Sequence, residues 1–447
     1  MYKLDRIDKW FLLILTIGII LRILALVNVD PALDSYTYYA AAKNILNCDY
    51  NSFRAPGFPI FLIPFLLIPY NYIFIIAPES KILLVTLQNP HLILTAQIAS
   101  LFAGLLLIIY SYVIFSKVAL KLPNETKTIK TKTISSGNIK LLGLFVSILI
   151  SLSLPFIINS AQGLREQLLS LLIIIIFYYI LIKEELTLRN NIVLALSISF
   201  LTLTHITGGL FITGGILLFF LVSKLKWFKY KNISNKKILV IILTTILSFF
   251  LWAWFCDFKF HDPLYSLQVQ RNFFKNAYNL DLSSPSNLIS ALLNGLLNGI
   301  PSEFYLMFLF NGVVFMLLVL YILLRNLRER QFLFIFLVVG SNLTYLSIFM
   351  AIPGDIRLIM YFFPLLIYLG SIPLNKIITK ADKSSLKKIY LFLILFITSF
   401  SFRGLTSIDF FRPFFKSPLS NAFYWILILI NELSLLIFII KYRKIIF

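Results

Sequence analysis

Apolar runs follow one another along the whole chain, separated by short polar segments, and most are near the length of a membrane-spanning helix. This pattern predicts an all-α, polytopic integral membrane protein with about twelve transmembrane helices. No polar block is long enough to form a soluble domain of ordinary size, so we expect a single membrane-embedded domain over residues 1–447. The expected spans are 10–29, 90–116, 141–160, 166–182, 191–206, 208–222, 238–256, 303–324, 331–350, 358–375, 389–402 and 421–440.

One further apolar stretch, residues 58–77, is long enough to span a bilayer but carries Pro59, Pro64 and Pro69. Each proline removes a backbone hydrogen bond that a helix in lipid needs. We therefore place this stretch at the outer membrane surface, as interfacial helices within a long first outer loop, 30–89. A second large outer loop is expected at 257–302.

The distribution of charge predicts the orientation. The chain is 59% hydrophobic and 13% charged, with a net charge of +21 and a mean hydropathy of +0.90. Its lysines lie in short clusters between the apolar runs, which is typical of cytoplasmic loops. We therefore expect both termini in the cytoplasm and an uncleaved signal anchor at the N-terminus. A nucleic-acid binder would present one continuous basic face, so no nucleic-acid partner is expected.

The densest polar chemistry lies directly after the first run, in residues 34–59. Asp34 stands at the start of a predicted helix over 35–46, which also carries Tyr38. The sequence leaves two interpretations of Asp34 open. One is an N-cap that accepts backbone amide hydrogen bonds, and the other is a general base, or an orienter, for an acceptor hydroxyl. A carboxylate can do both.

Asp34 and Tyr38 form an Asp-x-x-x-Tyr motif, and an Arg-x-Pro-Gly-x-Pro turn follows at residues 54–59. Placed after a first span, this order resembles the GT-C glycosyltransferases. The chain looks most similar to the group that uses polyprenyl-phosphate sugars, which includes the protein O-mannosyltransferases and the aminoarabinose transferases acting on lipid A. In that family the first outer loop carries the catalytic aspartate, which corresponds here to Asp34.

Later segments match the same family in order. Arg165 and Glu166 lie where the family's second acidic residue opens the fourth span. Segment 200–210 looks like the family's Leu-Thr-Arg/Lys-Pro-Thr-Gly segment, but His205 replaces the cation. Residues 352–366 look like the late loop in which an arginine and a tyrosine precede a proline-containing span.

The resemblance implies an enzyme of the cell membrane with its active site on the extracytoplasmic face. It implies transfer of a sugar from a polyprenyl- or dolichyl-phosphate donor to a protein, lipid or surface glycan, by one inverting displacement. The implied roles are catalytic for Asp34 and Glu166, donor-phosphate binding for Arg54, Arg165, His205, Arg271 and Arg357, and substrate positioning for Tyr38 and Tyr361.

The spacing of the three histidines fits no zinc motif. If a divalent metal such as Mg or Mn takes part, Asp34 and Glu166 are the residues expected to hold it. Two other functional classes stay open. A transporter or flippase of lipid-linked sugars would place polar residues at the bilayer midplane, and a non-catalytic assembly protein would keep only the scaffold.

Three polar residues lie outside these motifs. Arg22 is near the outer end of the first span, where we expect it to snorkel or to pair with an outer acid. Cys48 and Cys256 both fall on the predicted outer side, and we expect them to be unpaired, with a disulfide as the alternative.

Overall fold

A computed structural model of the chain describes residues 6–29, 32–50, 52, 54–68, 91–119, 136–183, 187–225, 235–269, 312–345, 360–380 and 418–446, with the single positions 272, 290, 293, 297 and 301. The elements within these ranges are all helices, with no strand among them, as the apolar runs predict. The protein is therefore an all-helical membrane protein.

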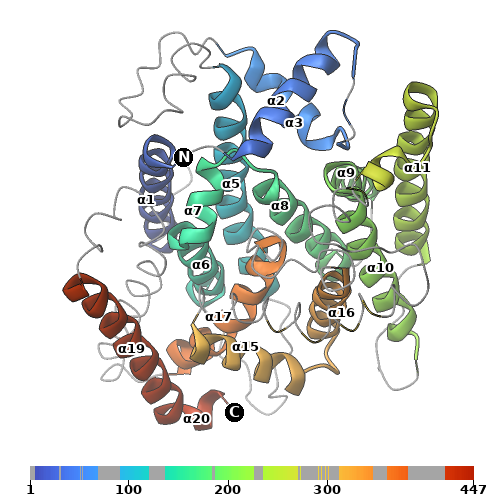
Figure 1. Cartoon of the computed structure of the whole chain (residues 1–447). Helices are drawn as coiled ribbons and strands as arrows, with labels where there is room; N and C mark the ends of the chain where they lie inside the picture. Colours follow the sequence, from blue (N-terminus) through green and yellow to red (C-terminus); the bar gives the residue numbers. More distant parts are fainter. Residues whose placement is uncertain are drawn as a thin grey trace.

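The helices form one bundle with a cap of short helices at one end (Figure 1). The first half of the chain contributes α1 (Arg6–Asn28), α2 (Leu33–Leu46), α3 (Gly57–Leu66), α5 (His91–Ala119), α6 (Ser136–Leu152), α7 (Leu154–Ala161), α8 (Glu166–Phe177), η2 (Tyr178–Ile182) and α9 (Leu188–Thr204). The second half contributes α10 (Ile206–Ser223), α11 (Asn235–Phe260), α15 (Val313–Arg325), α16 (Arg330–Tyr345), η6 (Met360–Phe362), α17 (Phe363–Lys380), α19 (Pro418–Lys441) and α20 (Arg443–Ile446).

Five stretches of the described chain are long and apolar enough to cross a membrane, and the bent pair α6–α7 makes a sixth if it counts as one span. They are Ile7–Leu26, Leu94–Val118, Ile206–Ser223, Asn235–Phe260 and Met360–Ile377. Four other expected spans correspond to the shorter apolar helices α8 with η2, α9, α15 and α16. The expected span at 421–440 corresponds to α19, and the one at 389–402 lies outside the described residues.

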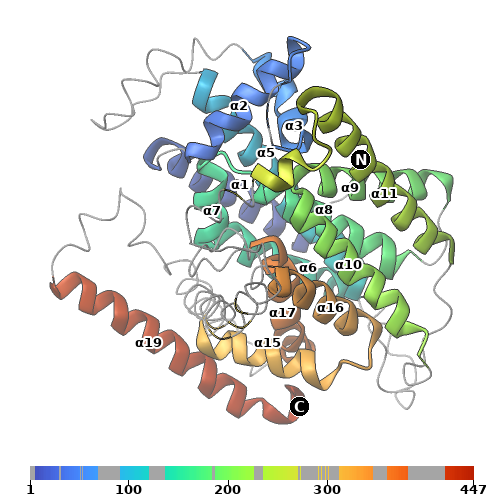
Figure 2. The same ribbon diagram turned by 45° about the vertical axis from the view of Figure 1, so that its right-hand side comes forward.

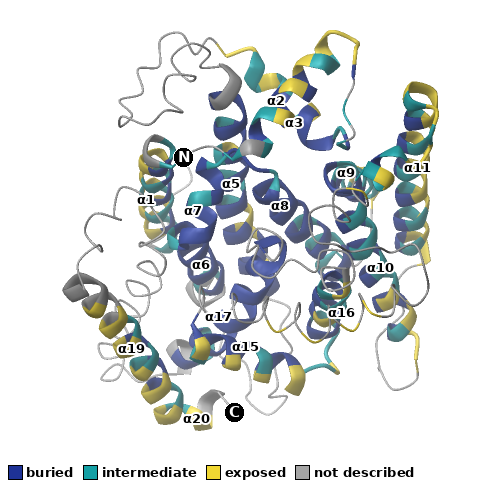
Figure 3. Ribbon diagram, in the orientation of Figure 1, coloured by how far each residue is buried: buried dark blue, intermediate teal, exposed yellow. Residues whose placement is uncertain are grey.

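Burial separates the central helices from the peripheral ones. Side chains of α5, α6, α8 and α17 are mostly buried, whereas α1, α11 and α19 show long exposed faces (Figure 3). The exposed face of α11 carries Phe250 and Trp254, which are 68% and 63% exposed. Large apolar groups exposed in this way along a helix are suited to contact lipid.

The cap is formed by α2 and α3, which pack on each other and on α5, while α3 also contacts α9 (Figure 2). At ten residues, α3 is about 15 Å long, which is half the thickness of a bilayer core. This described part of the proline-rich stretch is shorter than a bilayer core is thick. Residues 69–90 lie outside the described chain.

Polar contacts lie at the two ends of α5. At one end, the Gln97 side chain donates to the Ala161 carbonyl. About 22 Å further along the same helix, the Tyr112 hydroxyl donates to Asp8. Asp8 also pairs with Lys140 at 2.7 Å, and both residues belong to segments predicted to be cytoplasmic.

The expected span at 141–160 is interrupted, which the sequence analysis did not predict. Helix α6 ends at Leu152, and α7 begins at Leu154 after a bend of 55°. Pro155 lies in the first turn of α7, where it has no amide hydrogen to continue the ladder of α6. The break leaves the last carbonyls of α6 without helical partners.

Arg22 supplies those partners. Its guanidinium donates to the carbonyls of Ile150 and Ser151 at 3.2 and 3.1 Å, and to Gly18 of its own helix at 3.2 Å. The side chain is fully buried, so the expectation that it snorkels or pairs with an outer acid is wrong. A cation at the negative end of the α6 dipole is stabilised there without a carboxylate.

We predict that Arg22→Met lowers the thermal unfolding midpoint of the detergent-solubilised protein by several degrees. Hydrogen bonds from a charged donor contribute about 1.5–3 kcal/mol each, and methionine keeps only the apolar contacts. Arg22→Lys should lose less. Lys9→Met, an exposed charge removed from the same helix, is the matched control. Equal midpoints for Arg22→Met and Lys9→Met would contradict this role.

Candidate active site

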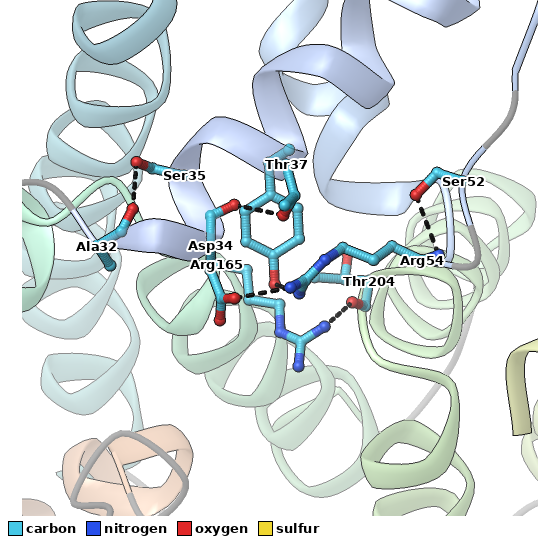
Figure 4. A network of polar contacts seen from close by, with 9 residues as sticks. Ala32, Asp34, Ser35, Thr37, Ser52, Arg54, Arg165 and Thr204 are labelled. Carbon is cyan, nitrogen blue, oxygen red and sulfur yellow. Dashed lines mark hydrogen bonds and ion pairs between the residues drawn. The ribbon is translucent and has the colours of Figure 1, made fainter. Parts of the chain in front are cut away.

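Four elements bring polar side chains together beneath α2. Arg54, from the turn before α3, donates to the Asp34 carboxylate at 2.6 Å and to the Tyr38 hydroxyl at 3.1 Å (Figure 4). The Arg54 guanidinium lies 4.7 Å from the centre of the Tyr38 ring, and that of Arg165 lies 5.9 Å from it. Tyr38 is thus contacted by two cations, one before α3 and one before α8.

Asp34 does not act as an N-cap. The N-cap of α2 is Ala32, with no side-chain cap bond, and Asp34 lies within the first turn. Its carboxylate instead holds Arg54. The Asp34 side chain is 37% exposed, whereas that of Arg54 is 17% exposed, so a dissolved molecule can reach the carboxylate. The N-cap interpretation of Asp34 is therefore wrong, and its carboxylate is an ion-pair partner of Arg54 that solvent can reach.

The turn carrying Arg54 is fixed by its own neighbours. The Tyr50 hydroxyl donates to the Arg54 carbonyl, and the Arg54 amide donates to Ser52 Oγ at 3.2 Å. Tyr50 itself packs against Trp252 and Phe255 of α11. The long helix α11 thereby holds the backbone of Arg54 in place.

Gly57 allows α3 to begin against the end of α9. A Cβ atom at Gly57 would lie 2.5 Å from the Thr204 amide nitrogen and 2.6 Å from the Leu203 carbonyl carbon. The Thr204 carbonyl, which ends α9, accepts a hydrogen bond from Arg165 at 3.1 Å. The Pro-Gly pair of the motif therefore serves a close backbone approach that places Arg54 near Arg165.

Arg165 and Glu166 open α8, as the sequence analysis predicts. The turn before them contains Gly163, whose φ of +72° favours glycine and which lies against the backbone of Gln97. Ser100 of α5 donates to the Leu164 carbonyl at 2.8 Å. Glu166 is 5% exposed, and its charge, like that of Asp34, acts on Tyr38.

A small pocket of about 40 Å³ lies beside the two arginines, lined by Arg54, Ala55, Arg165, His205, Ile206, Ser266 and Leu267. Three helices begin at or next to these residues. Arg165 is the N-cap of α8, His205 is the N-cap of α10, and α3 begins at Gly57, shortly after Ala55. Helix N-termini carry partial positive charge and free amide donors, so this pocket suits an anion.

His205 adds no positive charge to this pocket. Burial lowers its pKa well below the ordinary value, and the nearby Arg165 and Arg54 charges lower it further. The imidazole lies against the first turn of α10, where a Cβ at Gly208 would meet it at 2.0 Å. A neutral His205 can contribute a hydrogen bond, while the arginines and helix ends supply the positive charge.

Burial likewise raises the pKa of Tyr38, although Arg165 and Arg54 oppose this effect. The phenol therefore stays protonated at neutral pH and accepts the hydrogen bond from Arg54. Tyr38 is thus a neutral neighbour of both arginines.

The structure brings together most of the residues that the sequence analysis singles out. Tyr361 is fully buried, and its ring centre lies 6.0 Å from that of His205. Arg271 and Arg357 lie outside the described residues. Ser266 and Leu267 line the pocket but were not predicted, because nothing in their local sequence distinguishes them from the rest of the second outer loop. Cys48 and Cys256 are both free thiols, as expected.

The donor set does not fit a divalent metal. Asp34 is paired with Arg54, and the charges of both Asp34 and Glu166 act on Arg165. Within the described chain, no group of three or more His, Cys, Asp or Glu side chains could hold a metal ion.

The arrangement of helices is that of a known membrane fold. The chain is similar to the crystal structure of ArnT from Cupriavidus metallidurans bound to undecaprenyl phosphate, with a TM-score of 0.52 and 13% identity, over 96% of this chain and 75% of that one. No protein-family model and no curated protein matches the sequence. The structural likeness shows a GT-C-like fold, in agreement with the resemblance drawn from the motifs.

We predict that Gly57→Ala disrupts the site, because the new methyl group would collide with the backbone at the end of α9. Overpacking of this kind costs about 1–3 kcal/mol. The affinity for a phosphate ligand should fall together with the unfolding midpoint. Gly214→Ala in α10 is the matched control, since a Cβ there meets nothing within 4 Å. Identical behaviour of the two alanine variants would show that the close approach at Gly57 is unimportant.

Proposed function

We propose that the protein is a glycosyltransferase that uses a polyprenyl-phosphate sugar as its donor and acts at the extracytoplasmic face of the cell membrane. The observation that carries this proposal is the pocket at which two arginines and three helix N-termini meet, next to a water-accessible carboxylate. The arginines and helix N-termini suit a phosphate, and the carboxylate suits the activation of an acceptor. The fold shared with a protein crystallised with undecaprenyl phosphate supports the same donor class.

In the proposed mechanism, the phosphate of the donor lies against Arg54 and Arg165, with its lipid tail in the bilayer. Arginine binds phosphate oxygens through paired N–H donors, which orients the group as well as neutralising it. Asp34 accepts the proton of the acceptor hydroxyl, whose oxygen attacks the anomeric carbon from the side opposite the phosphate. The bond from the sugar to the phosphate oxygen breaks, and the configuration of the sugar is inverted.

The site requires no strong general acid in this mechanism. The leaving group is a phosphate that departs as an anion, so the protein has only to stabilise growing negative charge. Donors that are already in place perform this without reorganisation. Glu166 and Tyr361 lie within electrostatic range of Arg165, and we assign them to its positioning. The acceptor is a protein, a lipid or a surface glycan.

We predict that Asp34→Asn abolishes sugar transfer, with a fall in turnover of at least about a hundredfold, as expected for loss of a general base. The measurement is transfer by purified protein from lipid-phosphate sugars, with glycan mass spectrometry of a deletion strain to identify the acceptor. Asp49→Asn, which removes an exposed carboxylate paired with Lys259, is the control and should retain activity. Wild-type rates for Asp34→Asn, or sugar translocation without bond formation, would refute the proposal.

The proposed sidedness can be tested with the native thiols. Cys48 is exposed and lies in the same outer loop as Asp34, whereas Cys256 is buried. We predict that a membrane-impermeant maleimide labels Cys48 in intact cells and that Cys48→Ser removes the label. Lys224→Cys in the Cys48→Ser background, at an exposed position expected in the cytoplasm, should react only after permeabilisation. The reverse pattern would place the site on the cytoplasmic side.

A further inference from the structure

Arg54 lies between the Asp34 carboxylate and the anion pocket. One Nη atom binds Asp34 and the other binds Tyr38, while the residue also lines the anion pocket. Its backbone is held by Tyr50 and Ser52, so the guanidinium can turn while the main chain stays fixed. Arg54 therefore has access to the carboxylate and to the pocket from one anchored position.

Arg165 differs from Arg54 in its partners. It donates to the Thr204 carbonyl and lies near the Tyr38 ring, and within the described chain no carboxylate forms an ion pair with it. Its Nε atom is buried and has no hydrogen-bond partner among the described residues. Arg165 can therefore receive an anion without giving up an ion pair, whereas Arg54 must leave Asp34.

During the transfer, the charge changes at Asp34 and at the donor phosphate in the same step. This argument rests on the proposed function. The donor is a phosphodiester with a single negative charge, and the leaving polyprenyl phosphate is a monoester that gains a second one. Asp34 takes the acceptor proton and becomes neutral in the same step. The negative charge that Arg54 contacts thus disappears from Asp34 as it appears on the phosphate.

We propose that Arg54 exchanges partners during the transfer, holding Asp34 before the reaction and the leaving phosphate after it. The exchange keeps a largely buried guanidinium paired at every stage. The exchange also couples the anion pocket to Asp34, because a phosphate that binds Arg54 releases the Asp34 carboxylate from its ion pair. In the resting protein, Asp34 accordingly competes with the phosphate for Arg54.

The competition can be measured as binding, with no turnover. We expect Asp34→Asn to bind undecaprenyl phosphate about tenfold more tightly than the wild type, since the competing carboxylate is gone. Arg54→Gln should weaken binding by about tenfold or more. In the double variant, the gain from Asp34→Asn should disappear, because there is no guanidinium left to release. Asp49→Asn, with Lys259 as its partner, controls for the loss of an outer carboxylate and should bind as the wild type does.

Each outcome distinguishes between the hypotheses. If Asp34→Asn does not tighten binding, or if its gain is the same in the Arg54→Gln background, the partner exchange is wrong and the proposed function stands. If the wild-type protein does not bind undecaprenyl phosphate at all, the proposed function itself fails. Should Arg54→Gln not fold, Arg54→Lys replaces it in the cycle. A single ammonium cannot reproduce the two-sided hydrogen bonding of Arg54, so the gain from Asp34→Asn should be smaller in that background.

Discussion

A helix inside a bilayer can end only where other groups accept or donate the hydrogen bonds that its last turn leaves open. The candidate active site is built from such ends. Arg22 binds the last carbonyls of α6, the Gln97 side chain binds Ala161 at the end of α7, and Arg165 binds Thr204 at the end of α9. Each capped interruption gives the chain a place to turn, and the turns after α7 and α9 carry Arg165 and His205 of the pocket.

Because the site depends on capped helix ends, only part of it can be predicted from the sequence. The membrane class, the start of α8 at Glu166 and the turn at Arg54 follow from apolar runs, prolines and an ordered set of motifs. The partners of Arg22 are backbone carbonyls more than a hundred residues away, at Ile150 and Ser151. A carbonyl is present at every residue, so no local sequence pattern marks the ones that are left open.

The N-cap interpretation of Asp34 failed for a related reason. Local spacing allows an aspartate near a helix start to cap that helix, but a nearby arginine competes for the same oxygens. In the structure α2 begins at Leu33, so its N-cap is Ala32, and the Asp34 carboxylate within the first turn pairs with Arg54. Tertiary packing decides which hydrogen bond Asp34 makes.

Two ionisable residues inside expected spans also form hydrogen bonds with backbone groups at helix ends. Arg22 contacts carbonyls, and Glu432 of α19 accepts the Val314 amide hydrogen in the first turn of α15 at 2.8 Å. Neither contact describes a polar path across the bilayer, as a transporter would need. Both are explained by helix ends.

The chemical nature of the pocket's positive charge has a consequence for the living cell. Guanidinium groups and peptide dipoles do not titrate across any acidity at which cells grow, and His205 is held uncharged by its burial. On the proposed outer face, the pocket meets the external medium directly. The positive charge of this pocket is therefore maintained when the surroundings become acidic.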